Sequence, residues 1–267
     1  MIEAKKSTTA YWKIIICLIL FFITYAVNFI LPFEKTLFNF RDITERMWIW
    51  CEILISGLAI FYIFKMKKFS PKDLIVSIIL GIMSSTYYSC ISGICTTICY
   101  YSACQIFRKY SKQDKYFDLG AKNTLKSLLW GIVYAVPFAI ANNLGMFFGN
   151  VRVTNIVAAF LYALSPGISE EVIFHFFLIA FVTAVFMGNI PKNKCGILLT
   201  YILTIVPHSL IHLPLTFTQN PIGALLKFAI TSVIFNIPMV WLVRNKNLQT
   251  AVAFHWFVDF IRILFIA

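Results

Sequence analysis

The sequence predicts an all-α protein, a polytopic bundle of about eight transmembrane helices. Of its 267 residues, 60% are hydrophobic and 13% are charged, and the mean hydropathy is +0.82. This composition excludes a water-soluble domain of the same length and is typical of a helical membrane protein. The apolar residues also gather in long runs, most of them near or above the roughly 20 residues that cross a bilayer.

The distribution of charge supports the same class. The chain has 23 Lys and Arg against 11 Asp and Glu, a net charge of +12 that would also suit a nucleic-acid-binding protein. The basic residues, however, lie in the short segments between apolar runs, which is the positive-inside pattern of membrane proteins. We therefore expect the lipid bilayer, with its anionic headgroups, as a partner, and no nucleic acid.

The expected spans can be placed in chain order. The first follows Lys5 and Lys6; it is too long for a signal peptide and no small-residue cleavage site follows it, so it is expected to be retained. The clear apolar runs are Tyr11–Leu31, Met47–Phe64, Leu125–Phe148, Asn155–Met187, Cys195–Leu213, Ile222–Val243 and Thr250–Ala267.

The run Leu74–Phe107 is too long for one upright span, and its middle is small and polar. If it enters the membrane and returns, all the basic segments lie on one face, which favours a hairpin and a cytoplasmic N-terminus. Those segments are Lys5–Lys13, Lys65–Lys72, Arg108–Lys126, Lys192–Lys194 and Arg244–Lys246. We expect one integral domain of the cell membrane, in which residues 1–124 supply the first helices and residues 125–267 carry the functional site.

All four histidines belong to i, i+4 pairs inside apolar sequence. The pairs are Glu171 with His175, His208 with His212, and His255 with Asp259. This spacing puts both members on one face of a helix. An ionisable group within a bilayer costs about 2.5–3.5 kcal/mol on insertion scales, so it rarely persists without a function. Three such pairs predict one buried polar site, as in an intramembrane enzyme.

A further carboxylate, Glu170, precedes the first pair, after Pro166 and Gly167, which should weaken the helix. Adjacent residues point about 100° apart, so Glu170 and Glu171 should serve different partners. Taken singly, each pair has a plainer explanation: a solvated helix start, hydrogen bonds between helices, or a histidine oriented by an aspartate.

Together the three pairs resemble the CAAX-protease and bacteriocin-processing family of intramembrane endopeptidases, also called the CPBP or Abi family. Its pattern is Glu-Glu-x-x-x-Arg, Phe-x-x-x-His and His-x-x-x-Asn/Asp on three helices. Here Glu170-Glu171-x-x-x-His175, His208-x-x-x-His212 and His255-x-x-x-Asp259 follow in the same order. The resemblance covers about Leu125–Ala267. His175 replaces the arginine and His208 replaces the phenylalanine.

The resemblance implies hydrolysis of peptide bonds in membrane-associated peptides or precursors. Glu170 and His212 would activate water, and His255 with Asp259 would stabilise the oxyanion or hold the water. Glu171, His175 and His208 would support the site. No cofactor is expected, since a metal-free glutamate mechanism is favoured; the alternative is zinc on His208, His212 and His255.

Two other functions stay open. A non-catalytic immunity or scaffold protein would keep the fold and tolerate the changes at His175 and His208. A proton-coupled transporter would use the ionisable pairs as a relay, although no duplicated halves are visible. A shared site requires Glu170, His212 and His255 to lie roughly 3–7 Å apart. The remaining intramembrane charges, Glu52, Lys227 and Arg262, are expected to snorkel toward the interface.

Overall fold

The computed structural model describes residues 2–31, 40–67, 69–86, 89–111, 120–143, 152–188 and 193–266. This part of the chain forms an all-α bundle, as predicted, and seven of its helical segments are long and apolar enough to cross a membrane. Three further described helices, of 14, 6 and 17 residues, are shorter than these spans. The protein is thus an integral membrane protein of the expected polytopic class.

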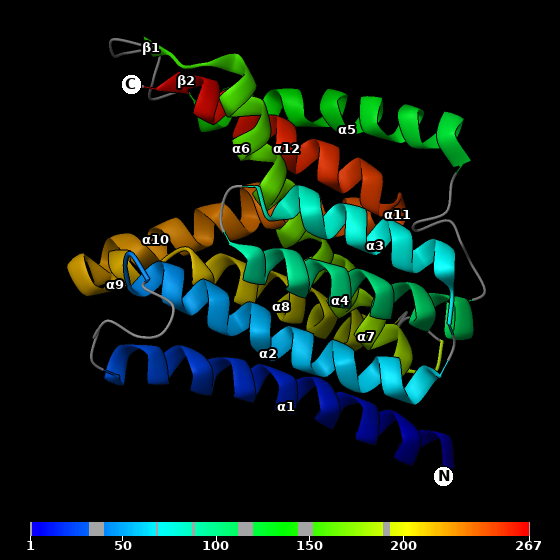
Figure 1. Cartoon of the computed structure of the whole chain (residues 1–267). Coiled ribbons are helices and arrows are strands. Elements are labelled where there is room, and N and C mark those ends of the chain that lie inside the picture. The colour runs from blue at the N-terminus through cyan, green and yellow to red at the C-terminus, as the bar shows by residue number, and fades with distance from the viewer. Residues whose placement is uncertain are drawn as a thin grey trace.

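The first half of the chain supplies five helices. In Figure 1, α1 lies along one side of the bundle and α5 along the opposite side, with α2, α3 and α4 between them. The π-helical segment η1 continues α4 directly. The bounds are α1 (Ile2–Ile30), α2 (Ile43–Met66), α3 (Pro71–Ser84), α4 (Cys90–Ile106), η1 (Phe107–Ser111) and α5 (Gly120–Asn142).

The second half contains the most buried helix and the C-terminal helix. Its segments are β1 (Arg152–Val153), α6 (Ile156–Glu170), η4 (Glu171–Phe177), α7 (Leu178–Val185), α8 (Lys194–Ile211), α9 (Pro214–Gln219), α10 (Pro221–Thr231), η5 (Ser232–Asn236), α11 (Ile237–Asn245), α12 (Leu248–Leu264) and β2 (Phe265–Ile266). The two short strands pair antiparallel, with Arg152 opposite Ile266. They tie the start of α6 to the end of α12.

The run Leu74–Phe107 forms two antiparallel helices, α3 and α4, as the hairpin interpretation predicted. The two backbones come so close that a Cβ atom on Gly81 would lie 2.6 Å from the carbonyl oxygen of Gly93. At the open end of the hairpin, the Arg108 guanidinium binds the Asp73 carboxylate, with Nη2 2.9 Å from Oδ1. Small residues and one ion pair therefore hold the hairpin together.

The described parts of the basic segments lie at one end of the bundle, the right-hand end in Figure 1. Hydrogen bonds link distant segments at this end of the bundle. Asn193 donates one to the Tyr11 hydroxyl at 2.8 Å, and Asn247 donates one to Ser127 at 3.1 Å. Residues 112–119 and 189–192, which the predicted basic segments include in part, lie outside the described residues. The arrangement agrees with the charge argument for a hairpin.

The helix formed by α6, η4 and α7 is the centre of the bundle. The most apolar stretch of its 30 residues is entirely buried, whereas that of α5 is only 17% buried. The helix was expected to weaken at Pro166, but α6 continues through this residue to Glu170. Transmembrane helices tolerate proline because neighbouring helices and local π geometry satisfy the freed backbone groups. Here π geometry begins at Glu171, directly after the proline turn.

Candidate functional site

Seven predicted residues meet where α6, η4, α8 and α12 pack together. We call this set the histidine cluster, and it contains every histidine of the chain. Glu170 ends α6, the next pair lies in η4, and the other residues come from the end of α8 and the middle of α12. Its members are Glu170, Glu171, His175, His208, His212, His255 and Asp259.

Local sequence explains how these helices come together. Gly167 lies one turn before Glu170, and a Cβ atom there would lie 3.1 Å from the backbone nitrogen of Trp256. The glycine therefore lets α12 approach closely beside His255. At the other side, α8 ends at Ile211 and α9 begins at Pro214, because proline has no backbone N–H with which to continue the hydrogen bonds of α8 and is favoured in the first turn of a helix. His212 is left as the capping residue at the end of α8.

Glu170 is the point at which the three motifs converge. Its Oε2 atom lies 3.4 Å from Nε2 of His212 and 3.8 Å from Nε2 of His255. These distances agree with the convergence expected from the sequence. The closest partner of Oε2 is Nε2 of His208, a residue for which the sequence predicted only support. That prediction was incomplete, because His208 contacts Glu170 directly.

Glu171 binds two histidines at once. Its Oε2 lies 2.9 Å from Nδ1 of His175, which confirms the predicted contact within this pair. Its Oε1 lies 3.0 Å from Nδ1 of His255. The two glutamates were expected to serve different partners, yet both contact the His255 ring, from opposite nitrogens. His255 therefore links the two carboxylates.

The two positions at which the sequence differs from the CPBP pattern it resembles contact each other. His175 and His208 lie 3.2 Å apart, Nε2 to Nδ1, and their rings meet edge to face. With this contact the interactions form a closed ring, which runs Glu170, His208, His175, Glu171, His255 and back to Glu170. His175 and His208 are therefore parts of one contact network.

The ring of contacts restricts where protons can lie. An ionised Glu171 only accepts hydrogen bonds, so His175 and His255 must each donate from Nδ1. A neutral His175 then accepts at Nε2 from Nδ1 of His208, which leaves Nε2 of His208 as a lone pair facing Glu170. Two acceptors do not attract each other. A proton or a metal cation between His208 and Glu170 is therefore required.

Asp259 lies at the edge of the cluster, beside His255 and the more exposed Arg262. Its Oδ2 is 3.5 Å from Nε2 of His255, and its Oδ1 is 3.0 Å from Nη2 of Arg262. The Arg262 side chain is 52% exposed, as expected for a snorkelling residue, and it balances the charge of the aspartate. Asp259 is thus held between one buried ring and one exposed cation.

The cluster opens into a cavity of about 370 Å³. Five of its residues line this space: Glu170, His208, His212, His255 and Asp259. His212 is the most accessible of the histidines, with 39% of its side chain exposed. Glu171 and His175 do not line the cavity, which fits their predicted supporting position.

Other polar and aromatic residues of the cavity were missed by the sequence analysis. The indole of Trp48 packs edge-on against the His212 ring, with the centroids 4.8 Å apart. Lys227 is exposed, as expected, but it also lines the cavity. Charged side chains inside membrane spans often mark a functional site, and this signal could have identified Lys227 and Arg262 as cavity residues. The missed set is Trp48, Asn142, Lys227, Thr231, Phe235, Asn236 and Arg262.

The prediction that Glu52 snorkels toward an interface is wrong. Its side chain is completely buried, because this position of α2 faces α4 and not the lipid. The carboxylate accepts hydrogen bonds from Nε1 of Trp48 at 2.9 Å and from the Ser92 hydroxyl at 2.7 Å. Neutral donors therefore satisfy this carboxylate inside the bundle.

The cluster also contains a suitable set of metal ligands. One ligand atom from each of Glu170, His208 and His212 lies within 4.8 Å of the others. Two histidines and one glutamate are a known zinc set, and a metal-binding histidine usually donates its second N–H to another protein group. His208 does so toward His175. The set differs from the three histidines that the sequence suggested as an alternative to a metal-free site, because both nitrogens of His255 face carboxylates.

Comparisons of the chain with protein-family models, curated proteins and solved structures gave no match. The geometry of the histidine cluster and its cavity is therefore the basis for assigning a function.

Proposed function

We propose that the protein is an intramembrane endopeptidase that hydrolyses peptide bonds of membrane-associated peptides or precursors. The observation that carries this proposal is the position of Glu170. Its carboxylate is almost completely buried, three histidine rings from two other helices surround it, and it lines a cavity large enough to admit a peptide segment. The sequence resemblance to the CPBP family points to the same reaction.

In this mechanism Glu170 and His212 act on a water molecule in the cavity. Glu170 accepts a proton from the water while the water oxygen forms a bond to the peptide carbonyl carbon. The carbonyl oxygen becomes an oxyanion beside His255, which Asp259 orients from 3.5 Å. When the C–N bond breaks, the proton held by Glu170 passes to the leaving amine.

The other residues of the ring keep these groups in position. Glu171 fixes both His255 and His175 by contacts of 3.0 and 2.9 Å. His175 in turn fixes His208. In the metal-free mechanism His208 carries a second proton, so that it balances the charge of Glu170 and leaves this carboxylate ionised. His208 is then a positioning residue.

A metal-dependent version of the reaction has a specific observation in its favour. Glu170, His208 and His212 would hold the ion, and the lone pair of His208 already faces this position. A bound zinc ion would supply Lewis-acid activation of the water and the carbonyl. His175 and Glu171 would then orient His208 from behind.

The transporter alternative gains no support from the network of contacts. A proton relay needs a path that leads across the membrane, whereas the ring returns to Glu170. A non-catalytic protein of the same fold remains the alternative that an activity experiment must exclude.

Peptide N-termini in the membrane fraction test the proposal without knowledge of the substrate. Cells that express the wild-type protein should produce new N-termini that are absent with Glu170→Gln, because Gln keeps the shape of Glu but cannot accept the proton. Glu52→Gln is the matched control, since it also neutralises a buried carboxylate of the bundle. Identical N-termini with wild type and Glu170→Gln would favour the non-catalytic protein.

Metal dependence is tested on the purified protein with a substrate so identified. The metal-free mechanism predicts that 1,10-phenanthroline leaves turnover unchanged and that the active protein holds no stoichiometric zinc. Loss of activity with the chelator, a metal content near one per chain that falls in His208→Phe, and recovery of the wild type with Zn²⁺ would instead establish the metal-dependent version.

A further inference from the structure

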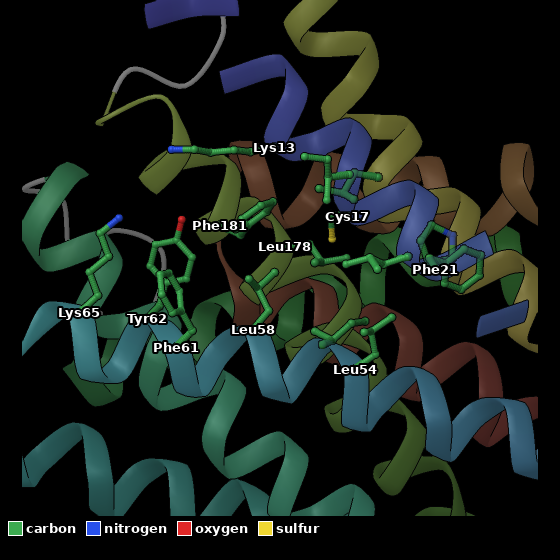
Figure 2. Close-up of a pocket in the computed structure, with 15 residues that line it drawn as sticks. Lys13, Cys17, Phe21, Leu54, Leu58, Phe61, Tyr62, Lys65, Leu178 and Phe181 are labelled. Carbon is green, nitrogen blue, oxygen red and sulfur yellow. The ribbon is translucent and has the colours of Figure 1, made fainter. Parts of the chain in front are cut away.

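A second cavity, of about 320 Å³, lies between α1, α2, α7 and α8. It has no lining residue in common with the cavity of the histidine cluster. Figure 2 shows the side chains that point into it from both walls. The mechanism proposed above makes no use of this space, which we call the α1–α2 cleft.

The α1–α2 cleft has one polar end and one apolar end. Lys13, Lys65 and the hydroxyl of Tyr62 lie together at the polar end in Figure 2, whereas Phe21 and Leu54 lie at the other. The described residues that line the cleft include no Asp or Glu. The polar end is therefore basic, and the remainder suits a hydrocarbon chain.

The position and depth of the α1–α2 cleft match one leaflet of a bilayer. Lys65 lies in the last turn of α2, at the basic end of the bundle. Leu54 is 11 positions earlier on the same helix, which at 1.5 Å per residue corresponds to about 16 Å. The hydrocarbon core of a bilayer is roughly 30 Å thick, so each leaflet contributes about half of that.

The mouth and the floor of the α1–α2 cleft differ in how exposed their side chains are. Ile16 and Phe61 at the mouth are 52% and 57% exposed, whereas Leu178 and Leu203 at the floor are each 1% exposed. An apolar chain can thus enter sideways from the membrane and rest on a well-packed floor. The ammonium group of Lys65 is held beside an aromatic ring, since its Nζ lies 5.4 Å from the centre of the Tyr62 ring.

We infer that the α1–α2 cleft binds an anionic phospholipid from the leaflet at the basic end of the bundle. One acyl chain occupies the cleft, and the headgroup phosphate pairs with the ammonium groups of Lys13 and Lys65. Each lysine near a membrane surface contributes about 1 kcal/mol of attraction to anionic lipid. Because the two lysines lie on opposite walls of one apolar cleft, they attract the headgroup of a lipid whose chain is bound in that cleft.

The bound chain supports the helices behind the histidine cluster. Leu178 directly follows η4, and Pro207 directly precedes His208. A lipid in the α1–α2 cleft fills the space between these helices and the pair α1 and α2. This inference does not depend on whether the protein is a peptidase.

Lipid binding by the purified full-length protein tests the inference. The protein in a neutral detergent is mixed with phosphatidylglycerol or with phosphatidylcholine of the same acyl chains. Native mass spectrometry then measures lipid retention, and thermal unfolding measures stabilisation. The wild-type protein should prefer phosphatidylglycerol, and K13A/K65A should weaken its binding roughly 5- to 30-fold.

Two sets of variants make the result specific to the α1–α2 cleft. K122A/K126A removes the same charge from α5, on the opposite side of the bundle in Figure 1, and should keep the preference. Leu58→Trp fills the cleft and should lower the retention of both lipids; Cys17→Phe fills it from the α1 wall if the first variant unfolds. The inference would be overturned if K13A/K65A and K122A/K126A lost the preference for phosphatidylglycerol equally. It would also be overturned if the variant with a filled cleft retained both lipids as well as the wild type does.

Discussion

Two buried carboxylate sites lie close together in this bundle and differ in their partners. Glu52 accepts hydrogen bonds from an indole N–H and a hydroxyl, and it is fully enclosed. Glu170 contacts three histidine nitrogens and lines a cavity. Trp48 connects the two sites, because it donates to Glu52 and packs against His212.

The difference shows what separates a structural acid from a reactive one inside a membrane. Trp and Ser donors hold their protons at neutral pH, so the site of Glu52 has no group to exchange a proton with. Histidines change their charge in the physiological range, so the site of Glu170 can receive and release protons. Burial alone therefore does not identify a functional carboxylate; its partners and its access to a cavity do.

The largest expected effect separates these two acids directly. Glu170→Gln should lower turnover by about 10²- to 10⁴-fold, the usual contribution of a general base, with little change in the melting temperature. Glu52→Gln should leave turnover nearly unchanged, because the Gln carbonyl oxygen still accepts from Trp48 and its amide N–H can donate to the hydroxyl of Ser92, which also accepts hydrogen bonds. Initial rates on one substrate, with thermal unfolding measured in parallel, provide the comparison. Equal rates for the two variants would show that the contrast between the sites has no functional meaning.

Removal of Glu171 should have the next largest effect. Glu171→Leu leaves the Nδ1 atoms of His175 and His255 without their acceptor, and a buried unsatisfied polar group costs about 1–3 kcal/mol. We expect a lower melting temperature together with reduced turnover, since both histidines lose their orientation. Glu171→Gln keeps one acceptor and should recover part of both losses. If Glu171→Leu melts like the wild type, the ring of contacts does not contribute to the fold.

The contact between His175 and His208 predicts coupling between these positions. His175→Arg alone puts a permanent cation next to His208, so it should reduce turnover. The double variant His175→Arg/His208→Phe has the Arg and Phe of the CPBP pattern at these positions and should be more active than that single variant. Contacting residues usually couple by 0.5–3 kcal/mol, which a double-mutant cycle of turnover rates measures. Additive effects would show that the two substitutions are independent.

The smallest expected effect belongs to Asp259→Asn. The CPBP pattern that this sequence resembles has either residue at the matching position, and the partner Arg262 is half exposed, so the lost charge is largely screened by solvent. Turnover should fall by no more than about fivefold, and the variant should fold normally. A loss as large as that of Glu170→Gln would assign Asp259 to the proton-transfer chemistry.

Much of this arrangement followed from sequence because it depends on periodicity and charge. Spacing of four residues put each ionisable pair on one helix face, and the basic segments identified the α3–α4 hairpin. The contact between His175 and His208 was not predictable in this way, since spacing says nothing about which faces of two different helices meet. Burial of Glu52 was missed for the same reason: a carboxylate just after Trp48 and Trp50 suggests an interfacial position until its partner Ser92 is known.

The π-helical geometry of η4 has a consequence for the length of the chain. A π segment accommodates more residues per turn than an α-helix, and one residue of α-helix corresponds to about 100° of rotation. Deleting one apolar residue of η4 would let this stretch relax to α geometry. Because the wider turn holds about one residue more than α geometry does, the helix before it and the helix after it would keep nearly the same relative rotation, and Glu170 would stay beside His208. The same deletion in α6 or α7 would rotate the two halves of the helix by about 100° relative to each other. A deletion in η4 is therefore expected to be less damaging than one in the flanking α-helical segments.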